Sequence, residues 1–267
     1  MESKILREID LRVSQGQRAA LVILTKNKGS APARQGSTMA VFQDGSSLGT
    51  VGGGAIEYDI MKRAQQAIKD GQDFEFDYNL SKDGKLQMSC GGASQGFVKV
   101  FYPNSQLIIF GAGHVGQKLA RIAVKTAFDV RVVDDRIDFK DAEDLKDISA
   151  FIGKNPEEAL ADLNFSKDST YIVVATRGHA QDQEVLENIL RKDFKYLGNI
   201  GSKAKVHSLR KKLTAKGFSK EEIDKIHMPI GIDIDNGSVE EIAISIMAEI
   251  LLIKNSGQLV QQKLEFE

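Results

Sequence analysis

Residues 107–120, LIIFGAGHVGQKLA, decide the fold of the C-terminal part of the chain. The first four residues form a continuous apolar run, which is typical of a strand buried on both faces of a sheet. Gly111, Gly113 and Gly116 follow at once with the spacing G-x-G-x-x-G. The first glycine permits a tight turn, the second lets backbone approach a phosphate, and the third lets a helix pack closely on the strand. The stretch therefore predicts a strand, a phosphate-binding turn and a helix.

The residues beyond the glycines fit this interpretation. A second apolar run, 130–133, ends in Asp134, about twenty residues on, where an acid can hold ribose hydroxyls. A helix that begins at the glycines would direct its unpaired N–H groups at an anion. A glycine-rich turn that binds no ligand is the alternative.

A further apolar run, 171–175, predicts a buried strand that leads into Arg177, His179 and Asp182. Ligands bind beyond the carboxyl ends of parallel strands, so these three side chains can hold a phosphate or another polar group. A hydrogen-bonded structural trio is an equal alternative. A short strand is predicted at 196–197, a helix over 204–216, and helices that begin after Ser219 and Ser238 from their capping-box spacing. The last helix, 239–254, is apolar enough to be buried against the sheet.

The N-terminal part shows a different pattern. It predicts a helix over 2–16, strands at 18–25 and 39–43, a loop over 26–36, and alternating strands at 74–78 and 95–102. This mixed pattern changes to strand and helix in alternation after Pro103. We therefore expect an α/β protein, with a small mixed α/β N-terminal domain over residues 1–104 and a Rossmann-like parallel-sheet domain over residues 105–267.

Composition narrows the cellular setting. The formal net charge is −1, which favours neither nucleic acid nor an anionic membrane. No apolar run is as long as a membrane span, and the N-terminus lacks a signal-peptide core. Cys90 is the single cysteine, which excludes an internal disulfide and suits a reducing compartment. We expect a cytoplasmic protein, without a nucleic-acid or membrane partner. His207 and His227 lie near lysines and are expected to be solvated.

Two other glycine-rich stretches are candidate ligand sites. Three glycines, 52–54, open a predicted helix and form either an anion cradle or a flexible turn. Cys90 precedes Gly91 and Gly92, which leave its thiol approachable and supply N–H groups that can stabilise a thiolate. An ordinary buried cysteine is the alternative.

Taken together, eight stretches resemble the XdhC/CoxI family, the xanthine dehydrogenase accessory factors. They are GSAPARQGSTM (29–39), GTVGGGAIE (49–57), MSCGG (88–92), FGAGHVGQKLA (110–120), VVDDR (132–136), TRGHAQD (176–182), GNIGSKAKV (198–206) and PIGIDIDNGSVEEIAISIMAEI (229–250). One position departs from the family pattern, because Ala33 stands where an arginine usually follows the proline, and Arg34 comes next.

The resemblance implies a maturation factor more than a stand-alone enzyme. Such a protein would bind molybdenum cofactor, as molybdopterin or its dinucleotide form, while a cysteine desulfurase installs the sulfido ligand. It would then deliver the cofactor to a xanthine dehydrogenase-like molybdenum hydroxylase. The resemblance places Cys90 near the molybdenum, as a candidate metal contact and the one catalytic candidate. The cofactor cleft is expected between the domains. The cofactor-binding residues that it implies, together with those from the motifs above, are Gly29, Ser30, Arg34, Gly53, Gly54, Glu57, Cys90, Gly91, Gly111, Gly113, His114, Gly116, Asp134, Arg177, His179 and Asp182.

Two other functions remain open on the residues alone. Asp134 after a dinucleotide fingerprint suits an NAD-dependent oxidoreductase, although the sequence offers no evident proton donor for it apart from His179. A regulatory module that binds NAD or another nucleotide is the second. The sequence also leaves open whether the edges of the sheets mediate formation of a homodimer.

Overall fold

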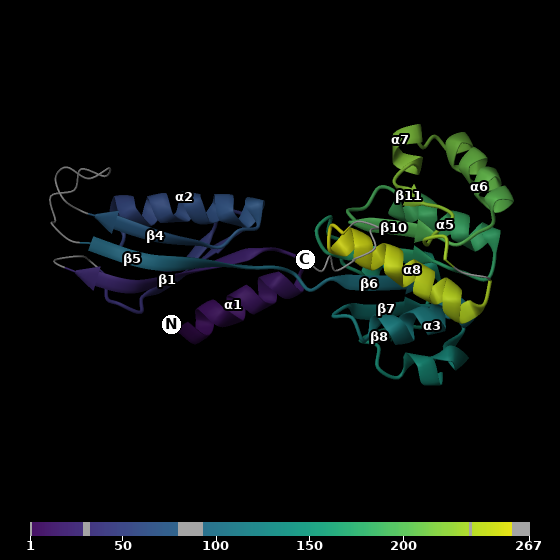
Figure 1. The fold of residues 1–267 in the computed structure, drawn as a ribbon, viewed down its shortest axis with the longest axis horizontal. Helices are drawn as coiled ribbons and strands as arrows, with labels where there is room; N and C mark the ends of the chain where they lie inside the picture. The colour runs from purple at the N-terminus through teal and green to yellow at the C-terminus, as the bar shows by residue number, and fades with distance from the viewer. Residues whose placement is uncertain (1, 29–32, 80–92, 235–236, 258–267) are drawn as a thin grey trace, which may run out of the picture. The chain divides into compact units, whose positions relative to one another are not determined.

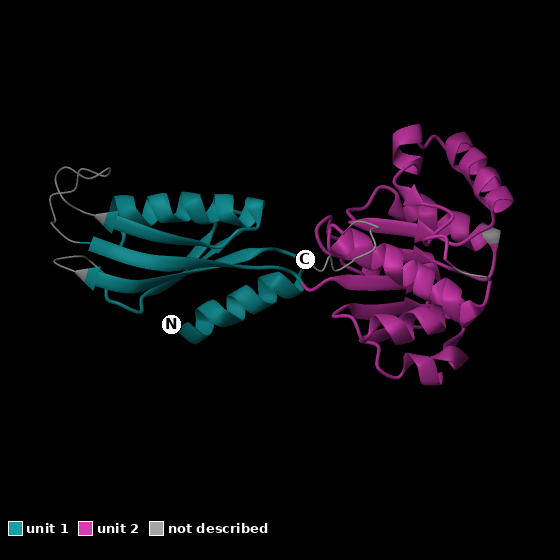
Figure 2. Ribbon diagram, viewed as in Figure 1, with its two compact units in different colours: residues 1–103 teal, residues 104–267 magenta. Residues whose placement is uncertain are grey.

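The computed structural model describes residues 2–28, 33–79, 93–234 and 237–257. The chain divides into two compact units, residues 1–103 and 104–267 (Figure 2). Each unit has its own sheet and its own core.

Unit 1 is a five-stranded antiparallel sheet with one helix on each face (Figure 1). The strand order is β3-β2-β1-β5-β4. Its elements are α1 (Glu2–Ser14), β1 (Ala19–Lys28), β2 (Thr38–Phe42), β3 (Ser47–Gly49), α2 (Gly54–Asp70), β4 (Phe74–Asn79) and β5 (Ala93–Phe101). Alternation along β1 explains the three layers, because Ala20, Val22 and Leu24 face α2 whereas Ala19 and Leu21 face α1.

The loop predicted from residue 26 begins later than the sequence suggests. Lys26, Asn27 and Lys28 continue β1, because they pair with Gln95, Ser94 and Ala93 of β5 after a register shift. A bulge of this kind carries polar residues into a strand, so their composition misled the prediction.

Unit 2 is a six-stranded parallel sheet with the order β11-β10-β9-β6-β7-β8. Its strands are β6 (Gln106–Phe110), β7 (Asp129–Val133), β8 (Ala150–Ile152), β9 (Thr170–Val174), β10 (Tyr196–Asn199) and β11 (Ile226–His227). In order along the chain, these strands are arranged 3-2-1-4-5-6 across the sheet, which is the doubly wound Rossmann arrangement. The predicted fold class is confirmed. The strand order reverses between β6 and β9, so a ligand crevice is expected beyond their carboxyl ends.

Helices cover both faces of this sheet (Figure 1). One face packs against α3 (His114–Ala123) and the apolar α8 (Val239–Lys254), as predicted for the last helix. The other packs against α4 (Pro156–Ala159), α5 (His179–Ile189), α6 (Lys203–Ala215) and α7 (Lys220–Ile223). The described part of the unit also contains three 3₁₀ helices: η1 (Ile137–Asp141), η2 (Glu143–Leu145) and η3 (Leu160–Asp162). Among the described residues, none of the helices combines the length and apolar content needed to cross a bilayer.

Candidate functional site

The glycine loop between β6 and α3 has a different steric reason for each glycine. Gly111 has φ +114°, and a methyl group there would lie 2.2 Å from the carbonyl oxygen of Ala175. A methyl group at Gly116 would lie 2.0 Å from the carbonyl oxygen of Gly111. At Gly113, by contrast, a methyl group would meet no described atom within 4 Å. The first and third glycines therefore let the loop and helix pack together, while the second leaves its backbone open to a ligand.

The open glycine is also the N-cap of α3. Gly113 is extended, with φ −69° and ψ −177°, and no described side chain caps its helix. The first bond back to it comes from Gln117 N–H at 2.9 Å, so the preceding helical N–H groups point out of the helix end. His114 occupies the first helical position and is exposed. This end combines unpaired donors with the positive pole of the helix dipole, which suits a phosphate.

Asp134 lies at the carboxyl end of β7 and stabilises the glycine loop from the side. One carboxylate oxygen, Oδ2, accepts from Ala112 N–H at 2.7 Å and from Arg136 Nη2 at 2.7 Å. The other, Oδ1, accepts from Arg136 Nε at 2.8 Å and from its N–H at 3.0 Å. Burial raises the pKa of Asp134, but the bonds from Arg136 and Ala112 outweigh it and leave the pKa below its usual value. Ribose hydroxyls would have to compete with this guanidinium for the carboxylate, so the predicted ribose contact stays a prediction.

The strands on either side of β6 are joined by an ion pair beyond their carboxyl ends. Arg177, after β9, contacts Asp135, after β7, with Nη2 3.0 Å from Oδ2. Because β6 lies between β7 and β9, this pair spans the end of the strand that carries the glycine loop. Arg177 is thus placed at the predicted crevice, with its side chain 55% exposed.

Asp182 and His179 belong to the first turn of α5. The Asp182 carboxylate is buried, and its Oδ1 accepts from the N–H (3.2 Å) and the hydroxyl of Thr176. This bond ties the β9 loop to the helix, which is the structural role left open by the sequence. The backbone of His179 begins α5, and its side chain lies outside the described structure.

In unit 1, the three-glycine turn already encloses an anion of the chain itself. Gly53 and Gly54 have φ +70° and +67° and open α2. The carboxylate of Glu57, in the first helical turn, accepts from Val51 N–H at 2.9 Å and Gly53 N–H at 3.0 Å, and from the hydroxyl of Thr50. Burial raises the pKa of Glu57, but the hydrogen bonds from these donors lower it by more, so the pKa lies below its usual value. The turn is an anion cradle whose anion is Glu57.

Four predicted site residues, Gly29, Ser30, Cys90 and Gly91, lie outside the described residues. The strands that lead to them are described: Lys28 at the end of β1 and Asn79 at the end of β4 both pair with Ala93 at the start of β5. Arg34 is exposed, and its carbonyl accepts from Ser37 N–H at 3.0 Å. Within the described ranges, no group of three or more His, Cys, Asp or Glu side chains is placed to hold a metal ion.

The sequence missed a polar cluster in unit 2. His227 was expected to be solvated, and its side chain is 40% exposed, but its Nδ1 also lies 2.7 Å from Oε1 of Glu249 on α8. The other oxygen of Glu249 accepts from the hydroxyl of Tyr196 at 2.8 Å and from Gly231 N–H at 2.6 Å. Burial raises the pKa of Glu249, but the three donors outweigh it and lower the pKa overall. The signal that could have found the cluster is Glu249 itself, a lone acid in an apolar helical run.

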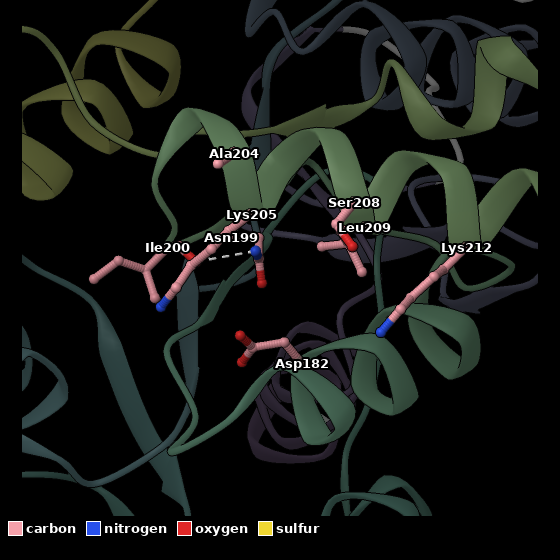
Figure 3. Close-up of a pocket in the computed structure, with 8 residues that line it drawn as sticks. All are labelled: Asp182, Asn199, Ile200, Ala204, Lys205, Ser208, Leu209 and Lys212. Atoms are coloured by element: carbon pink, nitrogen blue, oxygen red, sulfur yellow. Dashed lines mark hydrogen bonds between the residues drawn. The ribbon is translucent and has the colours of Figure 1, made fainter.

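A pocket of about 270 Å³ lies between α5 and α6, next to the end of β10 (Figure 3). Its polar lining comes from both helices and from the strand, with Asp182, Asn199, Lys205, Ser208 and Lys212. The strand predicted at 196–197 extends to Asn199, which is the last residue of β10 and is only 3% exposed.

Family models match both units of the chain. The XdhC Rossmann domain matches residues 107–250, and the XdhC and CoxI family matches residues 12–79. Both matches agree with the motifs quoted above.

Curated relatives and a solved structure are also similar. The chain is 30% identical over 240 residues to the uncharacterized protein YqeB of Escherichia coli K12, covering 89% of the chain and 44% of YqeB. It is 30% identical over 155 residues to a protein of Bacillus subtilis 168 named as a probable xanthine dehydrogenase subunit, covering 58% of the chain and 44% of that protein. The chain thus spans less than half the length of these two relatives. It is 23% identical to the molybdenum cofactor insertion chaperone PaoD of E. coli K12, covering 94% of the chain and 88% of PaoD. A crystal structure named as a xanthine dehydrogenase from Bacillus halodurans shares the fold, with a TM-score of 0.53, 20% identity, and coverage of 96% of this chain and 97% of that one.

Proposed function

Since the chain belongs to the XdhC and CoxI family, we propose that it is an accessory factor that binds molybdenum cofactor as cargo for a xanthine dehydrogenase-type hydroxylase. The observation that carries this proposal is the similarity to the insertion chaperone PaoD along 94% of the chain. The similarity spans both units, so both are proposed to take part.

The glycine loop is proposed to hold the phosphate of the cofactor or of its nucleotide. Three features support this: the open approach at Gly113, the helix end without a side-chain cap, and the position of the loop where the strand order reverses. Arg177 lies at the same crevice and would supply a positive charge to a second phosphate of a dinucleotide form.

Unit 1 is proposed to shelter the pterin and the metal. Arg34 and the Glu57-centred turn are the described parts of this proposal, whereas Gly29, Ser30, Cys90 and Gly91 lie outside the described residues. Cys90 would contact the molybdenum, relay sulfur to it, or protect it.

Two partners complete the proposal. A cysteine desulfurase would supply sulfur while the cofactor is bound, and a molybdenum hydroxylase would receive the cofactor. The chain would act in the cytoplasm, where molybdenum hydroxylases of this kind and their maturation factors would meet.

The test replaces Cys90 by Ser in the full chain and compares it with wild type in two assays. The first measures molybdenum cofactor retained by purified protein, and the second measures activation of a xanthine dehydrogenase-type hydroxylase. Loss of both would indicate direct contact with the metal, and loss of activation alone would indicate sulfur handling. Wild-type values in both would refute a role for Cys90.

A second candidate, an NAD-dependent oxidoreductase, is favoured by the strand order and the glycine loop. It predicts a change in nicotinamide absorbance when the protein is incubated with NAD and candidate substrates. The accessory role predicts none.

A further inference from the structure

The pocket between α5 and α6 contains a buried polar atom that the chain does not satisfy. Asn199 is 3% exposed, and its Oδ1 accepts no hydrogen bond from any described residue. The orientation of the amide is fixed, because its Nδ2 donates to the carbonyl of Ile200 at 3.1 Å. A buried acceptor without a donor is costly, and each such group in a folded protein calls for an explanation.

The surroundings of Asn199 make an amide there unusual. Its neighbour in β9 is Val174, which pairs with it in register, and Val174 in turn pairs with Phe110 of β6. Both neighbours belong to the apolar core under α5 and α6. A leucine or valine would suit the last position of this layer, so the amide points to a partner that is not part of the chain.

The opposite wall of the pocket is positively charged. Lys205, Ser208 and Lys212 lie on one face of α6, at spacings of three and four residues. Figure 3 shows the two lysine side chains extending on either side of the space between Asn199 and Asp182. Neither lysine forms an ion pair with the residues that the structure describes.

These groups define the chemistry of a ligand. Two ammonium groups and a hydroxyl suit a phosphate, which carries about −1.5 to −2 charges at pH 7. The amide oxygen of Asn199, with the carboxylate of Asp182 beside it, suits hydroxyl donors, as carboxylates hold ribose in dinucleotide sites. The volume of about 270 Å³ is near the lower limit of ligand pockets and far above the roughly 30 Å³ of a single water.

We propose that the α5–α6 pocket binds a phosphorylated sugar, either free or as part of a nucleoside monophosphate, with its hydroxyls on Asn199 and Asp182 and its phosphate between Lys205 and Lys212. The residues that line this pocket include none from the glycine loop at the start of α3, and the proposal does not depend on the proposed cofactor role.

The test is calorimetric titration of the full chain with ribose 5-phosphate, AMP, GMP, CMP and inorganic phosphate. We expect ribose 5-phosphate to bind more tightly than inorganic phosphate. Tighter binding of one nucleotide than of ribose 5-phosphate identifies the ligand as that nucleotide, while equal binding identifies a free sugar phosphate. Failure of all the sugar phosphates to bind overturns the proposal.

Variants place the binding in this pocket. Lys212→Ala should weaken ribose 5-phosphate binding by about tenfold, because it removes a charged hydrogen-bond donor. Lys211→Ala is the matched control: it removes the same charge from the neighbouring position of α6, outside the pocket lining. An equal loss in both variants would mean non-specific attraction to the helix and would overturn the proposal.

Asn199→Leu tests the sugar contact. It should abolish the preference for ribose 5-phosphate over inorganic phosphate while the protein stays folded, since the position lies in an apolar layer. A retained preference in the folded variant contradicts the proposal. If the variant does not fold, the comparison of Lys212→Ala with Lys211→Ala still tests whether the ligand binds in this pocket. Repeating the titrations in Gly113→Val separates this pocket from the glycine loop, because that substitution should leave the Lys212-dependent binding unchanged.

Discussion

Replacing Gly113 by valine should block nucleotide binding without unfolding the chain. The backbone there is extended at φ −69°, which any L-residue adopts, and the added Cβ meets no described atom within 4 Å. The main structural cost is the loss of a favourable N-cap glycine, about 0.5–1 kcal/mol. The new side chain would instead occupy the approach to the helix N–H groups. Loss of one charge-assisted hydrogen bond is worth about 1.5–3 kcal/mol, so the dissociation constant should rise by roughly ten- to 150-fold.

The assay is titration calorimetry with NAD in a Lys212→Ala background, which weakens the α5–α6 pocket proposed above, paired with thermal unfolding of each variant. Gly113→Ala is the graded control, with a smaller loss expected from its single methyl group. Gly116→Ala tests the opposite case, because its methyl would lie 2.0 Å from the carbonyl oxygen of Gly111 and should destabilise the unit. If Gly113→Val unfolds like wild type and binds nucleotide equally well, the assignment of this loop to phosphate is refuted.

Three further substitutions test the contacts around the sites by chemical denaturation. Asp134→Asn should cost about 2–3 kcal/mol of unfolding free energy at pH 7, which is less than for a fully buried ion pair because Arg136 is partly exposed. The pKa of Asp134 is lowered in the folded protein, so its contribution to stability is present above the unfolded pKa of about 3.9 and is lost as the pH falls through the folded pKa. The stability of the variant should therefore differ from that of wild type less at pH 3 than at pH 7. An equal difference at both pH values would contradict this. Glu57→Gln should cost about 1 kcal/mol, because an amide oxygen accepts more weakly from the backbone donors of the turn; no change would mean that the carboxylate does not stabilise it. Tyr196→Phe should cost about 1.5 kcal/mol through the lost bond to Glu249, and a neutral result would show that the Glu249 cluster does not depend on this hydroxyl.

The strongly periodic parts of the fold could be predicted from the sequence. The apolar run 107–110 and its glycines became β6 and the turn into α3. The capping-box spacing of Ser219 and Glu222 was confirmed, since both bonds of the box are present. Each of these signals is local, so neighbouring residues alone determine it.

The short edge strands could not be predicted. Strands β8 and β11 contain three and two residues, and neither has a full alternation to detect. They form because the sheet already presents an edge to which they can pair.

Side-chain partners were the other limit. The bidentate contact of Arg136 with Asp134, and the contact of His227 with Glu249, depend on how the chain folds back on itself. The burial of Asn199 within an apolar layer is of the same kind, because only the sheet register places it there. The spacing of the motifs identified the stretches that form the candidate site, but not which of their side-chain atoms already form hydrogen bonds within the chain.

Native mass spectrometry of the full chain, produced together with molybdenum cofactor biosynthesis, tests the proposed role most directly. We expect a bound mass equal to molybdopterin or its dinucleotide form, with molybdenum in the purified protein, and a large loss of that species in Gly113→Val. Wild-type protein that carries no pterin and no molybdenum, although a hydroxylase in the same cells acquires its cofactor, would refute the proposed role in cofactor binding.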